Sequence, residues 1–271
     1  MLEKLRLDRR TVILMGAAGG NMGTATAKAL CEAGAAVVGV DLTEQALGET
    51  AVLCKGLDGR FLGVAADVRQ EADIDRVLAT AIAEFGGADG LVNLVGGTQP
   101  GQWWPMEEMP NEVWEATLAL NLTYVFKTCR AVGRHMIETG RPGSMVNFAS
   151  VSGHASAPYH GCYGAAKAAV MSLTKTMAVE WGPHNIRVNC LSPSGSRGPR
   201  NARIRSETSP PRKSPAALPR AASADDFAAA CLYLLSDLSA WITGAVLSAD
   251  GGMTAQSPLG DTSFFADHVK R

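Results

Sequence analysis

Short apolar runs alternate with segments of helical periodicity along most of this 271-residue chain. Strands that are separated by helices run parallel, and a parallel sheet is covered by helices on both faces. The alternation therefore predicts an α/β fold built on one parallel sheet. The expected strands cover residues 11–15, 36–40, 60–65, 90–93, 145–149, 185–191 and 244–250, and the expected helices cover 24–33, 43–53, 71–85, 111–136, 163–181 and 224–236.

A glycine-rich turn follows the first expected strand. The segment from Gly16 to Gly23 reads Gly-Ala-Ala-Gly-Gly-Asn-Met-Gly and leads into an alanine-rich helix. Glycines let a backbone approach a pyrophosphate closely, while the N–H groups at a helix start face its charge. Strand, glycine turn and helix are the context of a dinucleotide site. A glycine turn by itself is weak evidence, because many loops need glycine for steric reasons.

An acidic residue, Asp41, ends the second expected strand, eighteen residues after Gly23. At about this distance a carboxylate accepts hydrogen bonds from the hydroxyls of an adenosine ribose. Its charge would repel a 2′-phosphate and no arginine follows it to compensate, so we expect NAD rather than NADP. The alternative is an aspartate that caps the helix 43–53.

Tyr163 and Lys167 stand four residues apart, so on a helix their side chains leave the same face. A lysine ammonium beside a phenol favours the phenolate and lowers the phenol's pKa. Ser150 lies at the end of a buried strand, from which its hydroxyl could hold a substrate oxygen within reach of Tyr163. Taken alone, a Tyr-x-x-x-Lys pair is usually a solvated helix face.

Composition excludes several other classes of protein. With 25 basic and 26 acidic residues the net charge is -1, which gives no general attraction to nucleic acid or to an anionic membrane. The six cysteines are scattered without metal-ligand spacing, which is typical of reduced thiols in a cytosolic protein and indicates no metal site. The first ten residues are too charged for a signal peptide, and no apolar stretch is long enough to span a bilayer. We therefore expect a soluble, cytoplasmic protein.

Residues 193–220 break the alternating pattern. They hold six of the thirteen prolines, and seven basic residues against one acid, Glu207. Such a segment is expected to be an irregular loop over a binding site or a disordered one. Its basic side chains would suit an anionic group on a substrate, although a solvated loop is an equal alternative. These side chains are Arg197, Arg200, Arg203, Arg205, Arg212, Lys213 and Arg220.

Several motifs occur in one fixed order, and together they resemble the short-chain dehydrogenase/reductase family over residues 10–253. The resemblance implies a single doubly wound (Rossmann) domain with a seven-stranded parallel sheet, here residues 1–253, followed by a tail, 254–271. It also implies binding of NAD(P) and assembly into a homotetramer or homodimer, often through the helices 111–136 and 163–181. The motifs are Gly16-x-x-x-Gly20, Asp67-Val68, Asn93 with Gly96, Asn121, Ser150, Tyr163-x-x-x-Lys167 and Asp250-Gly-Gly.

The resemblance also implies roles for individual residues. Tyr163 would be the general acid/base, and Ser150 would orient the substrate oxygen. Lys167 would hold the nicotinamide ribose and lower the pKa of Tyr163, and Asn121 would support a water that relays protons. Asp67 would meet the adenine ring and Val68 would pack against it. The remaining expected cofactor contacts are Gly16, Gly20, Asn21, Met22, Gly23, Asp41, Leu42, Asn93, Gly96, Pro193 and Ser194.

The chain departs from the family's pattern in its cofactor motifs. Met15 replaces a threonine, and the last glycine of the turn falls one place late, at Gly23. The Asn-Asn-Ala-Gly loop is Asn-Leu-Val-Gly at 93–96, and Ser194 follows Pro193 where glycine is usual. Gly198 stands where a threonine is expected. The four catalytic positions are intact, so the departures concern the cofactor contacts.

Three functional hypotheses follow. The first is an NAD-dependent oxidoreductase that transfers hydride between NAD(H) and a secondary alcohol or its ketone. The second is a catalytically idle NAD-binding sensor or subunit, and the third is an epimerase or dehydratase with the same fold. The substrate would be a small molecule bound between residues 97–104, 151–160 and 194–220.

Four side chains near the expected pocket leave their roles open. Trp103 and Trp104 could pack on a substrate, or could form a dimer contact or cover the core. His154 and His160 are expected to be pocket walls or surface residues rather than catalysts. Cys162 is expected to be a small packing residue rather than a reactive thiol.

Overall fold

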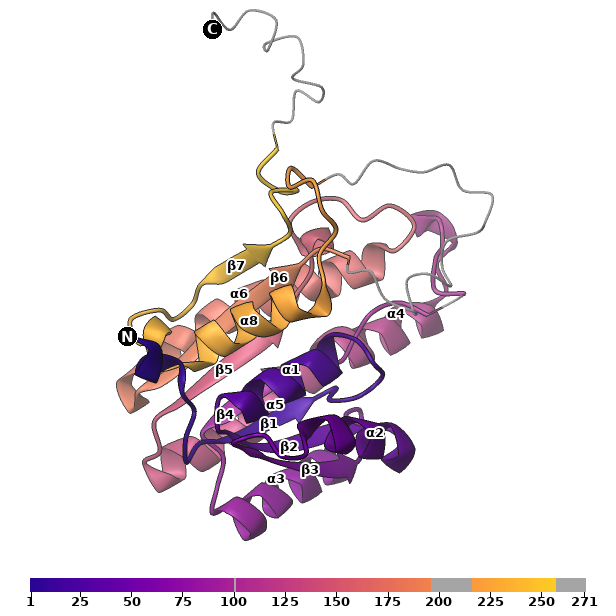
Figure 1. Ribbon diagram of the computed structural model, residues 1–271. Helices are drawn as coiled ribbons and strands as arrows, with labels where there is room; N and C mark the ends of the chain where they lie inside the picture. Colours follow the sequence, from indigo (N-terminus) through magenta and orange to yellow (C-terminus); the bar gives the residue numbers. More distant parts are fainter. Residues whose placement is uncertain (100, 196–215, 257–271) are drawn as a thin grey trace, which may run out of the picture.

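A computed structural model shows one parallel sheet of seven strands between two layers of helices (Figure 1). It describes residues 1–99, 101–195 and 216–256. The strand order is β3-β2-β1-β4-β5-β6-β7, so the chain reverses direction across the sheet between β3 and β4. This confirms the predicted doubly wound fold. The strands are β1 (Thr11–Met15), β2 (Ala36–Asp41), β3 (Arg60–Ala65), β4 (Gly90–Asn93), β5 (Gly143–Phe148), β6 (Ile186–Pro193) and β7 (Val246–Ala249).

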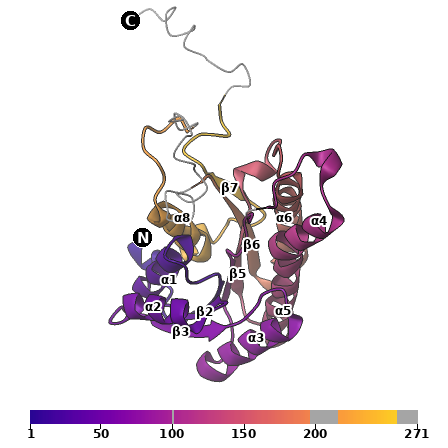
Figure 2. The same cartoon turned by 90° about the vertical axis from the view of Figure 1, so that its right-hand side faces the viewer.

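Helices cover both faces of the sheet, as Figure 2 shows. One face carries α1 (Met22–Glu32), α2 (Glu44–Cys54) and α8 (Ala224–Leu235). The other carries α3 (Glu71–Phe85), α4 (Asn111–Leu118), α5 (Tyr124–Thr139) and α6 (Gly161–Trp181). Short 3-10 turns lie at Leu2–Leu5, Met106–Glu108, Val151–Gly153, Gly182–His184 and Asp237–Ser239.

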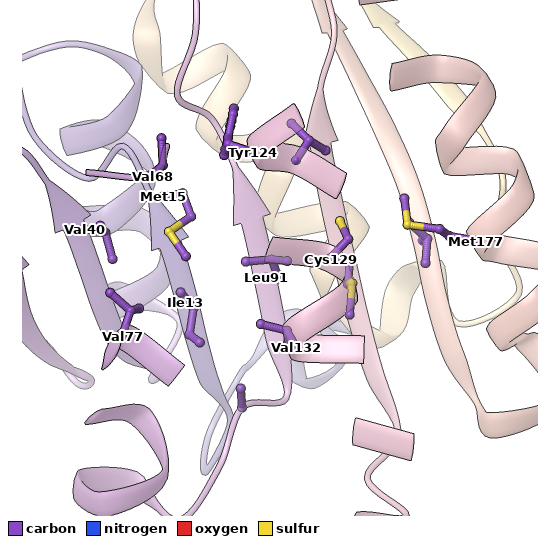
Figure 3. Packing of buried hydrophobic residues seen from close by; sticks show 14 of the residues in the cluster. Ile13, Met15, Val40, Val68, Val77, Leu91, Tyr124, Cys129, Val132 and Met177 are labelled. Carbon is purple, nitrogen blue, oxygen red and sulfur yellow. The ribbon is translucent and has the colours of Figure 1, made fainter. Parts of the chain in front are cut away.

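The two hydrophobic cores lie on opposite faces of the central strands. Every residue of β1 is buried, because both of its faces are covered, and its sequence is accordingly an unbroken run without the polar alternation of a half-exposed strand. Figure 3 shows the core under α3 and α5, where Ile13, Val77, Leu91 and Val132 pack together. Met15, the residue in place of the expected threonine, belongs to the same core and is 1% exposed.

The predicted strands agree with the observed ones to within about two residues at each end. One helix differs. The expected single helix 111–136 is two α-helices, α4 and α5, joined by a π-helical turn at Ala119–Thr123. π turns inside helices often mark functional sites. The division of the chain at residue 253 stays a prediction, and residues 257–271 lie outside the described residues.

The cysteines and the helices bear on two further expectations. All six cysteines are buried free thiols, and Cys162 is fully buried, which supports its interpretation as a packing residue. Within the described ranges, no helix is both long and apolar enough to cross a membrane. In the same part of the chain, no group of three or more His, Cys, Asp or Glu side chains could hold a metal ion.

Candidate active site

A cavity of about 410 Å³ opens at the carboxyl ends of β4, β5 and β6, beside the turn that follows β1. This is the point where the strand order reverses, at which open α/β sheets bind their ligands. The cavity brings together residues that the sequence places far apart. Its lining comprises Asn21, Met22, Leu94, Gly96, Gly97, Thr98, Trp103, Phe148, Ala149, Ser150, His160, Tyr163, Lys167, Pro193, Ser194 and Gly195.

Tyr163 and Lys167 lie in the first turns of α6 and both face the cavity. The Lys167 Nζ is 5.6 Å from the centroid of the Tyr163 ring and donates a hydrogen bond to the carbonyl oxygen of Phe148 at 2.9 Å. Lys167 is only 2% exposed. The alternative of a solvated helix face is therefore wrong for this pair.

Burial sets the proton affinities of both groups. It raises the pKa of Tyr163 above its ordinary value, and a hydrogen bond with Ser150 opposes part of that rise. It lowers the pKa of Lys167 to about 8. The expected lowering of the Tyr163 pKa by Lys167 is therefore not found. The physical reason is that burial of the phenol itself dominates its pKa, while the Lys167 ammonium donates to the Phe148 carbonyl and lies 5.6 Å from the Tyr163 ring centroid.

Ser150 follows β5 and begins a short 3-10 turn, where its Oγ accepts a hydrogen bond from the backbone N–H of Ser152 at 3.2 Å. This turn lies directly against α6. A Cβ added at Gly153 would come within 2.8 Å of the backbone nitrogen of Ala168, so the close approach requires glycine. The contact places the Ser150 hydroxyl beside Tyr163, as the sequence predicted.

Asn121 sits in the π turn and is fully buried. Its Oδ1 accepts a hydrogen bond from the Gly97 N–H at 2.8 Å, and its Nδ2 donates to the carbonyl oxygens of Gly97 and Thr117, both at 3.0 Å. Gly96 has φ +148°, and a Cβ there would lie 2.6 Å from Asn121 Oδ1 and 3.0 Å from Lys167 Nζ. Asn121 and Lys167 therefore lie so close to Gly96 that any side chain at this position would collide with them.

The glycine turn forms the opposite side of the cavity. Gly16 and Gly20 have φ values of +97° and +66°, which favour glycine, and the Gly20 N–H donates to Thr24 Oγ1 at 3.2 Å. Asn21 is the N-cap residue of α1. A Cβ at Gly23 would overlap the carbonyl oxygen of Gly16. The displaced last glycine thus keeps the close packing of helix on turn that a dinucleotide site needs.

Asp41 ends β2 beside this turn. Its carboxylate accepts hydrogen bonds from the backbone N–H of Ala18 at 3.1 Å and of Leu42 at 2.8 Å. Thr43, not Asp41, caps α2, because the Thr43 Oγ1 accepts from the Ala46 N–H. The alternative of a helix-capping aspartate is therefore wrong, and the carboxylate is held at the edge of the glycine turn.

Of three other expected cofactor residues, Asp67 and Val68 are engaged within the protein and Leu42 is not. Arg69 binds the Asp67 carboxylate through its Nε and Nη2, the shortest contact being 2.6 Å, and holds the pKa of Asp67 below its usual range. The Val68 side chain is buried in the core (Figure 3). Leu42, in contrast, is 64% exposed. None of the three lines the cavity itself, because each belongs to the sheet edge beyond β1.

Asn93 turns its side chain away from the cavity into a buried polar network. Its Nδ2 donates to Asn147 Oδ1 at 2.9 Å, and its Oδ1 accepts from Thr128 Oγ1 at 2.8 Å. Asn147 Nδ2 in turn donates to Thr174 Oγ1 at 3.0 Å. The network joins α5, β4, β5 and α6, so the side chain of Asn93 positions these elements.

His160 was expected only as a wall or surface residue, and it forms part of an aromatic wall of the cavity. Its ring lies 4.7 Å from Trp103 and 6.0 Å from Tyr163, measured between ring centroids. His154 instead reaches Ser192 Oγ at 3.0 Å. Trp104 does not line the cavity, and its indole N–H donates to the Gly101 carbonyl. Sequence spacing alone does not separate the two histidines or the two tryptophans.

The expected basic loop is described only in part. Arg220 makes two hydrogen bonds to the Asp226 carboxylate, at 2.6 and 2.7 Å, beside the capping box of α8. This residue is thus engaged with an acid of its own chain. The other six basic residues of the loop and Gly198 lie outside the described residues.

Comparison with known proteins identifies the family. The sequence model described as enoyl-(acyl carrier protein) reductase matches residues 16–254. This chain belongs to the short-chain dehydrogenase/reductase family. The 2,5-dichloro-2,5-cyclohexadiene-1,4-diol dehydrogenase of Sphingobium indicum is 36% identical over 252 residues, which are 92% of this chain and 98% of that enzyme.

Two further similarities are equally extensive. The D-threitol dehydrogenase of Mycolicibacterium smegmatis is 36% identical over 258 residues, covering 92% of this chain and 94% of that one. The structure of carveol dehydrogenase from Mycobacterium avium in complex with NAD has a TM-score of 0.84 and 30% identity, covering 93% and 99%. The predicted oxidoreductase of the alcohol dehydrogenase or ketone reductase type is confirmed.

Proposed function

We propose that this short-chain dehydrogenase/reductase uses NAD(H) to interconvert a secondary alcohol and its ketone, with Tyr163 as the general acid/base. The observation that carries this proposal is the arrangement of Ser150, Tyr163 and Lys167 around one cavity at the switch point of the sheet. The cavity also borders the glycine turn, whose positive φ angles and Gly23 packing leave backbone exposed to a pyrophosphate.

The proton transfer is assigned to Tyr163. In alcohol oxidation its phenolate accepts the proton of the substrate hydroxyl, and in ketone reduction its phenol donates one to the forming alkoxide. Ser150, which lines the same cavity as Tyr163, holds the substrate oxygen within reach of the phenol. The bound nicotinamide supplies or takes up the hydride. Because burial raises the pKa of Tyr163, we expect oxidation by the enzyme to accelerate as the pH rises.

Lys167 and Asn121 support this step. The buried ammonium of Lys167 would hold the nicotinamide ribose, while its hydrogen bond to Phe148 fixes its direction. Asn121 orders the loop backbone at Gly97 through two hydrogen bonds, and it lies across Gly96 from Lys167. We assign to Asn121 the support of a water that passes protons to Lys167.

Asp41 supports NAD over NADP. Its carboxylate lies at the end of β2, beside the glycine turn, where a ribose 2′-phosphate would meet a like charge. The neighbouring cation Arg69 is paired with Asp67 rather than with Asp41.

We also propose that the enzyme works in the cytoplasm as a homotetramer or homodimer. Exposed Phe126 on α5 and Val179 on α6 support pairing of these helices between copies.

A spectrophotometric assay at the NADH absorbance band tests the proposal. NAD and NADP would each be offered with a panel of neutral and anionic secondary alcohols, using wild type and Tyr163→Phe. We expect NAD-linked turnover, with a loss of kcat in the variant of at least about a hundredfold. NADH binding, followed by its fluorescence, should persist in the variant. Turnover that survives in Tyr163→Phe would disprove the assigned role.

A further inference from the structure

The ring of His160 is held in one orientation by three neighbours. Trp103 packs against one side of it in a tilted arrangement, with a centroid distance of 4.7 Å and an interplanar angle of 34°. Its Nδ1 lies 2.9 Å from the carbonyl oxygen of Pro158. Tyr163 lies beyond it, with the ring centroids 6.0 Å apart. His160 is also the N-cap residue of α6, the helix that carries Tyr163.

These contacts decide which nitrogen carries the proton. A carbonyl oxygen only accepts hydrogen bonds, so Nδ1 must be the N–H donor to Pro158. In the neutral ring Nε2 is then an acceptor, and its nearest described partner is the Ser152 hydroxyl at the long distance of 3.4 Å. His160 lines the cavity, whereas Ser152 is not one of its lining residues. The ring therefore offers an incompletely satisfied acceptor on the wall beside Tyr163.

An acceptor in this position discriminates between substrates. A ligand with only hydrocarbon beside the reacting alcohol would cover Nε2 without replacing its hydrogen bond to water, which is unfavourable. A second hydroxyl on the ligand would donate to Nε2 instead. A carboxylate is a poorer fit: within the described lining the one charged side chain is Lys167, which is bound to Phe148.

We infer that the Nε2 of His160 accepts a hydrogen bond from a second hydroxyl of the substrate, with Trp103 covering the carbon skeleton, so that the enzyme acts on diols or polyols in preference to simple secondary alcohols. The inference rests on the proposed function, since the first hydroxyl must reach Tyr163. Two of the similar enzymes, one named for a cyclohexadiene diol and one for D-threitol, act on such substrates.

Matched substrate pairs test the inference. The kcat/KM with NAD would be compared for meso-2,3-butanediol against 2-butanol, and for cis-1,2-cyclohexanediol against cyclohexanol. We expect wild type to favour each diol by about tenfold or more, the usual effect of a hydrogen bond to a polar group that the bound substrate shields from water. His160→Phe keeps a ring against Trp103 but removes the acceptor, and it should abolish this preference, so that the kcat/KM ratio of diol to monoalcohol falls to about one.

Two further variants separate recognition from structural damage. His160→Gln, which can restore an acceptor, should recover part of the diol preference. His154→Phe is the control. His154 belongs to the same segment but contacts Ser192 and does not line the cavity, so this variant should prefer diols as strongly as wild type does. Two results would overturn the inference and leave the proposed function intact. One is a wild type without diol preference, and the other is a His160→Phe variant in which kcat/KM falls equally for diol and monoalcohol. The wild-type ratio decides even if a variant does not fold. If no alcohol in the panel is oxidised, both proposals fail together.

Discussion

The glycine turn after β1 and the loop after β5 border the same cavity, yet they are held by different kinds of contact. The turn is held by its backbone: positive φ angles at Gly16 and Gly20 and the missing side chain at Gly23 set its shape. The loop and its helix are held by side chains, namely the hydroxyl of Ser150 and the ammonium of Lys167. The turn departs from the family pattern in sequence, whereas Asn121, Ser150, Tyr163 and Lys167 do not. Backbone geometry is kept when a glycine is displaced by one place, whereas a contact made by a particular side chain is not.

The largest effect on stability is expected when a side chain is introduced into the glycine turn. In Gly23→Ala the new Cβ would overlap the Gly16 carbonyl oxygen, and backbone cannot move aside cheaply. We expect the free energy of unfolding to fall by about 3 kcal/mol and NADH binding to weaken. Chemical denaturation and NADH titration would measure both quantities.

Gly48→Ala serves as the control, because Gly48 lies inside α2 with open space at its Cβ position. This variant should gain about 0.5–1 kcal/mol of stability. Equal behaviour of the two variants would show that the turn does not depend on close packing at Gly23.

A smaller effect on stability is expected from the charge of Lys167, on the helix that follows the second loop. The folded pKa of Lys167, about 8, is below its ordinary value of 10.5, so above pH 8 the folded chain releases this proton before the unfolded chain does. Burying the ammonium is therefore unfavourable below pH 8, and the penalty is relieved as the pH rises from 8 to 10.5.

The difference in unfolding free energy between wild type and Lys167→Met should accordingly shift in favour of wild type by on the order of 2 kcal/mol between pH 7 and 10. Denaturation curves at several pH values would show it. Lys175→Met, an exposed lysine of the same helix, should give no such shift. Parallel curves for wild type and Lys167→Met would contradict the expected coupling.

The smallest effect concerns cofactor choice. Asp41→Asn keeps the shape of the side chain and removes its charge, so the ratio of kcat/KM for NAD to that for NADP should fall by about tenfold. Glu44→Gln removes a nearby charge in the first turn of α2 and should leave the ratio unchanged. An unaltered preference in Asp41→Asn would move cofactor selection to another residue.

Much of the fold was readable from the sequence, because strands buried on both faces and helices with one apolar face leave strong local patterns. The residues Ser150, Tyr163 and Lys167 were also brought together as expected. Contacts between segments that are distant in the sequence could not be predicted from it. Asn121, in the π turn at Ala119–Thr123, is hydrogen-bonded to Gly97. The local hydrophobic periodicity predicts neither the turn nor these hydrogen bonds.

The same limit applies to individual side chains. Asn93 stands at a strand end, where both a cavity and a core lie within reach, and only the positions of Thr128 and Asn147 decide that it faces the core. The pKa of Tyr163 depends on how deeply it is buried, a property of the assembled molecule. His160 and His154 differ by what packs against them rather than by their spacing from Tyr163.

The buried polar network of Thr128, Asn93, Asn147 and Thr174 has a consequence for redesign. Apolar contacts tolerate small slides between layers, whereas a chain of directed hydrogen bonds holds α5 and α6 in one register on the strands. Anyone transplanting a new substrate pocket onto this scaffold would therefore retain these four interior residues, together with Gly97 and Gly153, and vary other positions of the loops around them. Those four interior residues align the layers from which the loops extend.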